Sequence, residues 1–388
     1  MKPVAIVGVG MTPVREHWTL SIGELGEAAG RAALADAGLA AVDALYVGNA
    51  YGATYNQQTQ LGSLITGRIG LAGIESFGCE AGDASGGVAL RAGYLAVAAG
   101  AAQTALVVGV EKATDLVGLA RNTARGVSLD HDYETVNGAT LTAMAALLMR
   151  RYMVEHCVEL AQFEGFSVNA HRNGSRNPNA MYRNLLRSGA FGKAPMIAEP
   201  VSLFDSAPDA DGAAALVLAP ADEAVDLVPR PVLLAGSAVA TDSLMLQERA
   251  DPLRFAAVSR STSQALDQAG LTPGDLDMAE VHDGYTIMTA LALEAMGFSE
   301  RGAGWRWAQA DGEQLSLEGE LPISTFGGLK SRGNPSGATG VYQAAEATLQ
   351  LRDAAGDNQV ANAASAVVQN LGGLASTAVT HVLRAMPE

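Results

Sequence analysis

The chain is poor in cysteine and in basic residues, and it contains no apolar run long enough to cross a bilayer. Its 388 residues include only Cys79 and Cys157, so the sequence indicates neither a disulfide framework nor a cysteine-rich metal site, and we expect no bound metal. The 25 Lys and Arg residues face 41 Asp and Glu residues, and the net charge of −16 argues against a broad nucleic-acid-binding surface. Because no signal peptide or membrane span is evident, we expect a cytoplasmic protein that binds neither nucleic acid nor membrane.

Apolar residues, in contrast, are abundant, and they follow an alternating strand and helix pattern. With 48% hydrophobic residues, a chain of this length can bury a large core and fill two domains. Residues 4–10 predict a buried strand, and residues 21–37 predict a helix capped by Ser21 and ended by Gly38. The apolar run at 105–110 is typical of a strand that is covered on both faces of its sheet. This alternation predicts an α/β fold.

An internal repeat divides the chain. The segment LADAGL and the strand-like ALYVGN that follows it, within residues 34–49, are echoed by LDQAGL and MAEVH within residues 266–282. We therefore expect a duplication, with an N-terminal half over residues 1–229 and a C-terminal half over residues 230–388. Residues 115–200 differ in character, being rich in Arg, Asn and Met, and predict a cap inserted into the first half.

The stretch around Asp83 is the strongest candidate for a reactive position. Small residues form a turn, and residues 88–99 then read as a helix so poor in charge that it must be buried. Backbone N–H groups and the helix dipole at such a turn can tune a reactive group. The alternative is that Asp83 is only the helix N-cap, a role in which Asp is favoured over Ala by about 1 kcal/mol.

Four segments carry a resemblance to a known family. They are the turn at Asp83, VHDGYT at 281–286, GGLKSRGNPSGATG at 327–340 and QNLGG at 369–373. In this order they resemble the active-site motifs of the thiolase superfamily, in particular the sterol-carrier-protein type. The resemblance covers nearly the whole chain, and it implies a five-layer αβαβα sandwich with the active site where the two halves meet.

The residues that thiolases use for catalysis are replaced. Thiolysis needs a thiolate nucleophile, a base that activates it and a second acid or base. This sequence has Asp83 at the nucleophile position, Asn334 in place of the activating His and Gly284 in place of the second Cys. Cys79 lies four residues before the turn and is expected to be a buried small residue. Thiolase activity is therefore not expected.

The groups that bind a thioester and stabilise an enolate are retained. His282 matches the family position that donates into the thioester oxyanion hole, and Asn334 offers an amide donor but no base. Tyr285 and Tyr342 add two phenols, which could exchange protons if their surroundings lower the pKa from about 10. The alternative for both tyrosines is a packed aromatic residue, and for His282 a structural one.

The sequence is similar to thiolase-like aldolases of bacterial steroid side-chain degradation, formerly labelled lipid-transfer proteins. That resemblance implies retro-aldol cleavage of a bulky β-hydroxyacyl-CoA, such as a cholesterol or bile acid side chain, to a ketone or aldehyde plus propionyl-CoA or acetyl-CoA. It implies Tyr285 and Tyr342 as the catalytic pair and a homodimer joined by a small OB-fold, zinc-ribbon-type partner in a heterotetramer. No cofactor is expected to bind tightly, because the substrate brings its own coenzyme A. The alternatives are a non-catalytic acyl-CoA-binding protein and an acyltransferase using Cys79 or Asp83.

The glycine-rich loops supply the expected contacts to coenzyme A. Lys330 and Arg332 are candidates for the CoA phosphates, although a solvated face is the alternative for both. Three glycines in the same motifs are predicted to allow close approach of the backbone to the cofactor, namely Gly337, Gly340 and Gly373. The cap histidines His131, His156 and His171 are expected at the surface of the cap.

Overall fold

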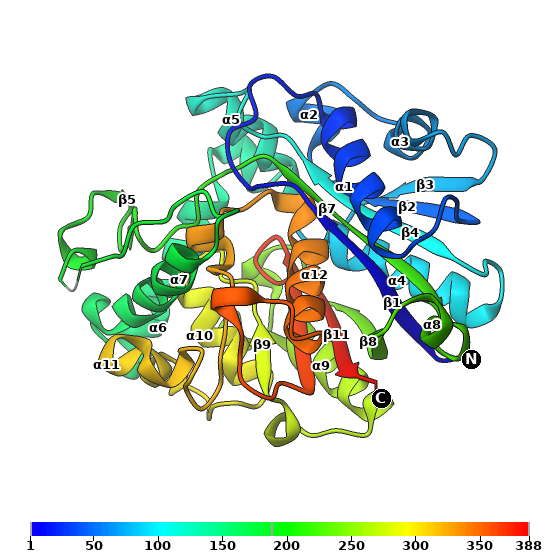
Figure 1. Ribbon diagram of the computed structural model, residues 1–388. Helices are drawn as coiled ribbons and strands as arrows, with labels where there is room; N and C mark the ends of the chain where they lie inside the picture. The colour runs from blue at the N-terminus through cyan, green and yellow to red at the C-terminus, as the bar shows by residue number, and fades with distance from the viewer. Residues whose placement is uncertain (1, 188, 387–388) are drawn as a thin grey trace.

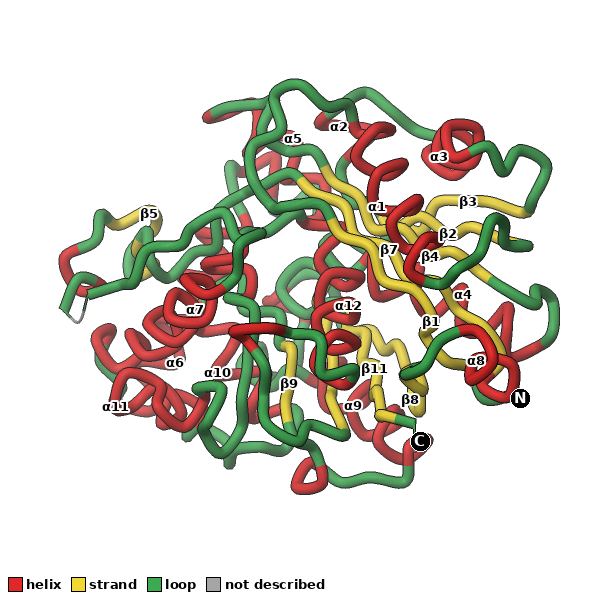
Figure 2. The backbone as a smooth tube through the Cα atoms, viewed as in Figure 1, coloured by secondary structure: helices red, strands yellow, loops and turns green. Residues whose placement is uncertain are grey.

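Nine strands form one continuous hydrogen-bonded array in the computed structural model, which describes residues 2–187 and 189–386 (Figures 1 and 2). Their order is β3-β2-β4-β7-β1-β8-β11-β10-β9. The two halves meet where β1 pairs with β8 through Ala5–Leu233 and Ile6–Val232. The strands are β1 (Val4–Met11), β2 (Ala44–Gly48), β3 (Glu75–Cys79), β4 (Ala105–Glu111), β7 (Gly212–Pro220), β8 (Val232–Thr241), β9 (Met278–Glu280), β10 (Ser365–Gly372) and β11 (Thr377–Ala385).

Helices α4 (Ser85–Ala99) and α12 (Thr339–Leu351) lie between the two halves of the array. Each contacts strands of both halves, and they contact each other. Helices α1 (Ile22–Asp36) and α3 (Leu61–Ile69) cover the opposite face of the first half, and α9 (Ala256–Ala269) covers β8 and β11. These are five layers in the order αβαβα, so the expected fold class is confirmed. The short helices α2 (Gly52–Tyr55) and α8 (Ala221–Leu227) complete the first half.

Side-chain alternation along the strands explains why both faces of the sheet are apolar. In β4, Leu106 and Val108 belong to the core cluster that includes α1, whereas Val107 belongs to the cluster that includes α4 and α12. A strand buried on both faces must therefore be apolar at every position, as the run at 105–110 is. Helix α1 also begins as expected, with a capping box between Ser21 and Glu24.

The elements of the two halves run in the same order. The sequence β1-α1-β2, then α4-β4-β7, is matched by β8-α9-β9, then α12-β10-β11. The repeated residues fall on α1 with β2 and on α9 with β9, so the duplication expected from the sequence is present in the fold. The exact division at residue 229 stays a prediction.

The segment between β4 and β7 forms the cap, at the left of Figure 1. It contains α5 (Gly118–Arg125), α6 (Leu141–His156), α7 (Glu164–Arg176), β5 (Met196–Ala198) and β6 (Val201–Ser202). Helix α6 packs against α10 (Thr286–Ala295), and the Tyr152 hydroxyl donates to Glu294 at 2.6 Å. Helix α7 packs against the π-helical turn Gly328–Arg332 and against α11 (Gln309–Gly312). The cap is therefore fixed to the second half of the chain, and the bounds 115–200 remain a prediction.

Candidate functional site

Asp83 is a buried, doubly bound carboxylate and not the cap of α4. Its Oδ1 accepts from the Tyr51 hydroxyl at 2.8 Å, and its Oδ2 accepts from Nη2 of Arg125 at 3.0 Å. The N-cap position of α4 is Ala84, and no side chain caps that helix among the described residues. The N-cap interpretation is therefore wrong, and both carboxylate oxygens are engaged in one fixed geometry.

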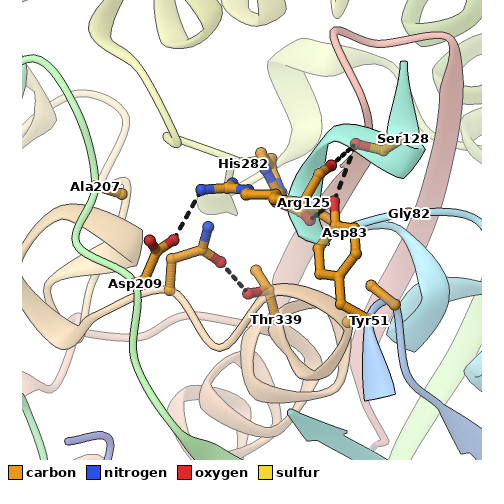
Figure 3. A network of polar contacts seen from close by, with 12 residues as sticks. Tyr51, Gly82, Asp83, Arg125, Ser128, Ala207, Asp209, His282 and Thr339 are labelled. Atoms are coloured by element: carbon orange, nitrogen blue, oxygen red, sulfur yellow. Dashed lines mark hydrogen bonds and ion pairs between the residues drawn. The ribbon is translucent and has the colours of Figure 1, made fainter. Parts of the chain in front are cut away.

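Arg125, the last residue of α5, connects Asp83 to Asp209. Its Nη1 donates to Oδ1 of Asp209 at 2.8 Å, so the guanidinium lies between two carboxylates, beside His282 (Figure 3). Burial lowers the pKa of Arg125, but the charges of Asp83 and Asp209 outweigh burial and raise it above its ordinary value. The ion-paired arginine is thus permanently charged. Neither Arg125 nor Asp209 belongs to a recognised motif, and no signal in the sequence could have placed them here.

His282 presents a single N–H donor to the site. Asn370 accepts from the N–H of Gly87 through Oδ1 at 3.1 Å, which directs its Nδ2 toward Nδ1 of His282 at 3.2 Å. Because Nδ1 of His282 accepts this bond, the hydrogen of the neutral ring is on Nε2. Burial lowers the pKa of His282 to about 4, against the opposing charge of Asp83, so the ring is neutral at pH 7.

Gly284 keeps the space in front of this donor open. A Cβ atom at Gly284 would lie 3.4 Å from Nε2 of His282, which is ordinary van der Waals contact. The glycine that replaces the second thiolase cysteine thus places no side chain beside the His282 N–H.

Asn334 supplies a second donor. Its Oδ1 accepts from the Thr339 hydroxyl at 2.8 Å, and no described residue accepts from its Nδ2. The segment 206–210 holds Asn334 and Gly284 in place from one side: Ala207 N donates to Gly284 O at 2.9 Å, and Asn334 N donates to Pro208 O at 3.0 Å. The two donor-bearing loops are therefore anchored to the same short segment.

Tyr285 belongs to this group of residues, but its phenol is not activated. Its hydroxyl lies 2.9 Å from Oγ1 of Thr142 in the cap. Burial raises the pKa of Tyr285, although Arg125 and the bond to Thr142 act in the opposite direction. The lowered pKa that acid–base catalysis by this phenol requires is not found.

Tyr342 lies elsewhere. Its hydroxyl donates to the carbonyl oxygen of Thr12 at 2.8 Å and lies 3.1 Å from Oγ1 of the same residue, and its ring packs 5.0 Å from the Arg332 guanidinium. The side chain is buried at 1% exposure, and burial raises its pKa. The expected pairing of Tyr285 with Tyr342 is therefore not formed, because helix α12 directs Tyr342 toward the end of β1.

The two basic residues of the glycine-rich loop are both buried, so the solvated-face interpretation is wrong. Arg332 forms an ion pair with Glu346 at 2.5 Å and is 1% exposed, which removes it from the expected contact with CoA phosphates. Lys330 donates to the backbone oxygen of Asp205, and burial lowers its pKa to about 8 despite the charges of Asp283 and Asp205. Lys330 lines a cavity with the cap, whereas Arg332 lines a different one with Tyr342 and Glu346.

The three glycines assigned to the cofactor serve packing. A Cβ at Gly337 would come within 2.4 Å of the backbone N of Ala50, and one at Gly340 within 2.3 Å of Asn370. These two glycines therefore allow close approach within the protein, and their contact with coenzyme A stays a prediction. Gly373 has φ of +56° in the turn between β10 and β11, next to Gly82, and so brings the C-terminal loop to the Asp83 turn.

A cavity of about 690 Å³ is lined almost entirely by the cap, and Lys330 is the one described lining residue from the second half. Arg125 and Asp209 line the cavity on the side of Asp83, and Lys330 and His171 also line it, so His171 is not a simple cap-surface residue. The apolar part of the wall comes from the cap: Leu141, Leu185, Leu186, Ile197, Leu203 and Phe204. No group of side chains suited to a metal ion occurs among the described residues, and in the same part of the chain no helix combines the length and apolarity needed to cross a membrane.

Comparison with known proteins identifies the family. The thiolase N-terminal domain matches residues 4–185, and the thiolase C-terminal domain-like family matches residues 238–385. The chain belongs to the thiolase family. This thiolase-family protein is 40% identical to the acetyl-CoA acetyltransferase of Methanothermobacter thermautotrophicus over 98% of its own length and 99% of that protein. It is 28% identical to human sterol carrier protein 2, covering 100% of this chain and 73% of the other.

Among solved structures, the thiolase-family chain resembles the Ltp2-ChsH2(DUF35) aldolase. The TM-score is 0.86 at 25% identity, and the match covers 99% of this chain and 98% of the other. The relatives therefore carry the names of two different activities, an acyltransferase and an aldolase.

Proposed function

We propose that this thiolase-family protein is a carbon–carbon lyase that cleaves a β-hydroxyacyl-CoA by a retro-aldol reaction. The observation that carries the proposal is the state of Asp83: the nucleophile position holds a carboxylate bound by Tyr51 and Arg125. The donors that an enolate oxygen needs are nevertheless present, as Nε2–H of His282 and the amide of Asn334. A site without a nucleophile but with enolate donors suits cleavage rather than acyl transfer.

Each donor has a defined role in the proposed reaction. The thioester oxygen accepts from His282 and Asn334, the β-hydroxyl loses its proton, and the Cα–Cβ bond breaks. Its electron pair becomes the enolate of the shortened acyl-CoA, and the released half becomes a ketone or aldehyde. The hydrogen bond from neutral His282 becomes stronger as negative charge develops on the thioester oxygen. Because the bond to the ground-state carbonyl is weaker, the interaction lowers the barrier. The enolate is finally protonated at Cα.

The finer parts of the proposal concern the substrate, the location and the assembly. The apolar cap wall of the cavity and the structural likeness to an aldolase support a bulky substrate, for which we propose a steroid side chain and a cytoplasmic location. The aldolase is named together with ChsH2(DUF35), which supports a small partner protein here. Strand β3 ends the sheet and leaves Phe77 47% exposed, which supports pairing with a second copy.

Acyl transfer is the second candidate, because the acetyl-CoA acetyltransferase of M. thermautotrophicus is 40% identical. The chemistry would need another nucleophile. Burial raises the pKa of Cys79 to about 11, and its thiol lines a different cavity, near Asn49 and Gly62. A third possibility, an acyl-CoA-binding protein without chemistry, leaves the open donors of His282 and Asn334 unexplained.

Incubation with defined thioesters separates these functions. The purified chain, alone and with a DUF35-type partner, is given short-chain and steroid β-hydroxyacyl-CoA substrates, and the products are followed by mass spectrometry. A carbonyl product with a shortened acyl-CoA supports the lyase. Formation of acetoacetyl-CoA from acetyl-CoA, abolished by alkylation of Cys79, supports acyl transfer. Tight binding of every thioester without any product supports the binding protein.

A further inference from the structure

His171 of α7 is built like a catalytic base. Its Nδ1 lies 3.1 Å from the carbonyl oxygen of Asn184, and because a carbonyl can only accept, Nδ1 carries the hydrogen. The neutral ring therefore keeps the lone pair of Nε2 as an acceptor. The ring is held between Tyr182, stacked at 6.5 Å, and Phe204, edge-on at 6.3 Å. All three side chains line the large cavity.

Lys330 brings a donor to the same cavity. One of its three N–H groups is used by the Asp205 carbonyl oxygen, and no carboxylate oxygen of the described residues lies within 4.0 Å of Nζ. The other N–H groups are not paired in the described part of the chain, and the side chain lines the same cavity as His171. Burial lowers the pKa of the His171 imidazole, and the charge of Lys330 lowers it further.

We propose that His171 and Lys330 bind the reacting β-hydroxyl of the substrate, with Nε2 of His171 as the proton acceptor and the Lys330 ammonium as the donor to the oxygen. The inference rests on the proposed lyase function and names its base. A hydroxyl has one proton to give and lone pairs to receive a bond, which matches one acceptor beside one donor. A carboxylate has no proton for Nε2, and an alkyl group would leave the Lys330 donors without a partner.

The fold connects the Lys330 turn to the loop of the enolate donors. Leu329 N donates to Oδ1 of Asp283 at 2.7 Å, so the turn that carries Lys330 is bound directly to the loop that carries His282. A Cβ at Gly284 would lie 3.9 Å from the Leu329 side chain. Ser206 lines the cavity and forms an isolated bridge with Tyr285, next to Gly284. The proposal therefore requires a substrate whose thioester oxygen reaches His282 while its β-hydroxyl enters the cavity at His171 and Lys330.

The proton and the electrons balance without a further reactant. Nε2 of His171 takes the β-hydroxyl proton, and the O–H electron pair forms the new carbonyl bond as Cα–Cβ breaks. Lys330 stabilises the oxygen while it is an incipient alkoxide, and the enolate is held by His282 and Asn334. The imidazolium then returns the same proton to Cα, which leaves a ketone or aldehyde and the shortened acyl-CoA. His171 is better suited than the two phenols, because burial raises the pKa of Tyr285 and Tyr342 points elsewhere.

The His171→Asn variant tests the base with little change to the fold, because the Asn amide can still donate to the Asn184 carbonyl while Nε2 is lost. In the full chain with its partner protein, kcat for cleavage is expected to fall at least 100-fold, with KM changing by less than about threefold. Added imidazole should restore part of the kcat of His171→Ala. His131→Gln, an exposed cap histidine bound to Thr135, is the matched control and should stay within twofold of wild type.

The pH profile gives a second readout. Lys330 is the charged group and Tyr182 the titratable ring that face His171 among the described residues. Because the pKa of His171 is lowered from 6.5, kcat should fall on acidification only below that value, and this limb should vanish in His171→Asn. A kcat within twofold of wild type with the limb intact would overturn the inference.

Binding keeps the test independent of turnover. Calorimetry compares a β-hydroxyacyl-CoA analogue with its deoxy counterpart, both as CoA thioethers, because a methylene group in place of the thioester carbonyl leaves no enolate to form and so prevents cleavage. Wild type should prefer the hydroxyl ligand about tenfold, and Lys330→Met and His171→Asn should each lose the preference. If wild type cleaves no thioester, the lyase function fails, yet the affinities still decide the hydroxyl site. Equal affinities for the two ligands in wild type would contradict it.

Discussion

The starts of α10 and α12 each carry a tyrosine after a thiolase-like motif, and the two regions have opposite roles in the fold. Tyr285 lies with His282 in a loop whose charged neighbours, Arg125 and Asp209, line the cavity. Tyr342 lies behind the glycine-rich loop, with Arg332 above its ring and Thr12 on its hydroxyl. The contrast shows that a motif fixes the path of the backbone, whereas the side-chain partners decide whether a residue faces substrate or the protein interior.

Breaking the buried ion pair between Arg332 and Glu346, in the region of Tyr342, should have the largest effect on stability. Arg332→Met leaves Glu346 buried at 2% side-chain exposure without its partner, and the free energy of unfolding should fall by about 3–5 kcal/mol. Denaturant titration measures the loss. The double variant Arg332→Met with Glu346→Met should recover most of the stability, since no charge is then left unpaired. A loss below about 1 kcal/mol in the single variant would show that this region is more hydrated than the structure indicates.

In the cavity region, loss of a donor should reduce turnover instead of stability. His282→Leu removes the Nε2–H and should lower kcat for retro-aldol cleavage by about 100- to 1000-fold. The variant's KM should change far less, because the interaction strengthens mainly in the transition state. Steady-state kinetics with a β-hydroxyacyl-CoA provide the measurement. His381→Leu is a matched control, since that buried histidine lies 3.0 Å from the Gly87 carbonyl and forms no hydrogen bond with His282 or Asn334. Equal kcat losses in the two variants would argue for a structural role of His282.

How far the sequence predicted these differences depends on the kind of contact. The strands, the duplication and the buried helix α4 follow from local apolar patterns, and the four motifs correctly brought His282, Asn334 and the Asp83 turn together. Arg125 and Asp209 were missed because they come from the cap and between elements, where no period or spacing marks a partner. Tyr342 was placed wrongly because its orientation depends on the rotation of α12 against β1, which a motif does not encode.

Removing the hydroxyl of each tyrosine in turn compares the two regions directly. Tyr342→Phe removes the hydroxyl that donates to Thr12, and the free energy of unfolding should fall by about 1 kcal/mol while kcat stays within twofold. Tyr285→Phe loses the contact with Thr142 and the phenol beside Arg125, and it should lower kcat by about tenfold through altered positioning of the cap. Thermal unfolding and steady-state kinetics on both variants decide the question. The reverse pattern, with Tyr342→Phe the less active protein, would restore the tyrosine pair as the catalytic residues.

Acidification should lower the free energy of unfolding gradually, with the smallest change near pH 7. The folded-state pKa of His282 is lowered from 6.5 to about 4, so between these values the unfolded chain binds a proton that the folded chain does not. Stability should therefore be nearly constant above pH 7 and fall as the pH drops from 6.5 toward 4, by about 1.4 kcal/mol per pH unit at most from this residue. Urea titrations of wild type and His282→Leu at pH 7 and pH 5 isolate the contribution. The variant should lose less stability over that interval, because it lacks the buried imidazole, and identical losses would mean that His282 is not held neutral by burial.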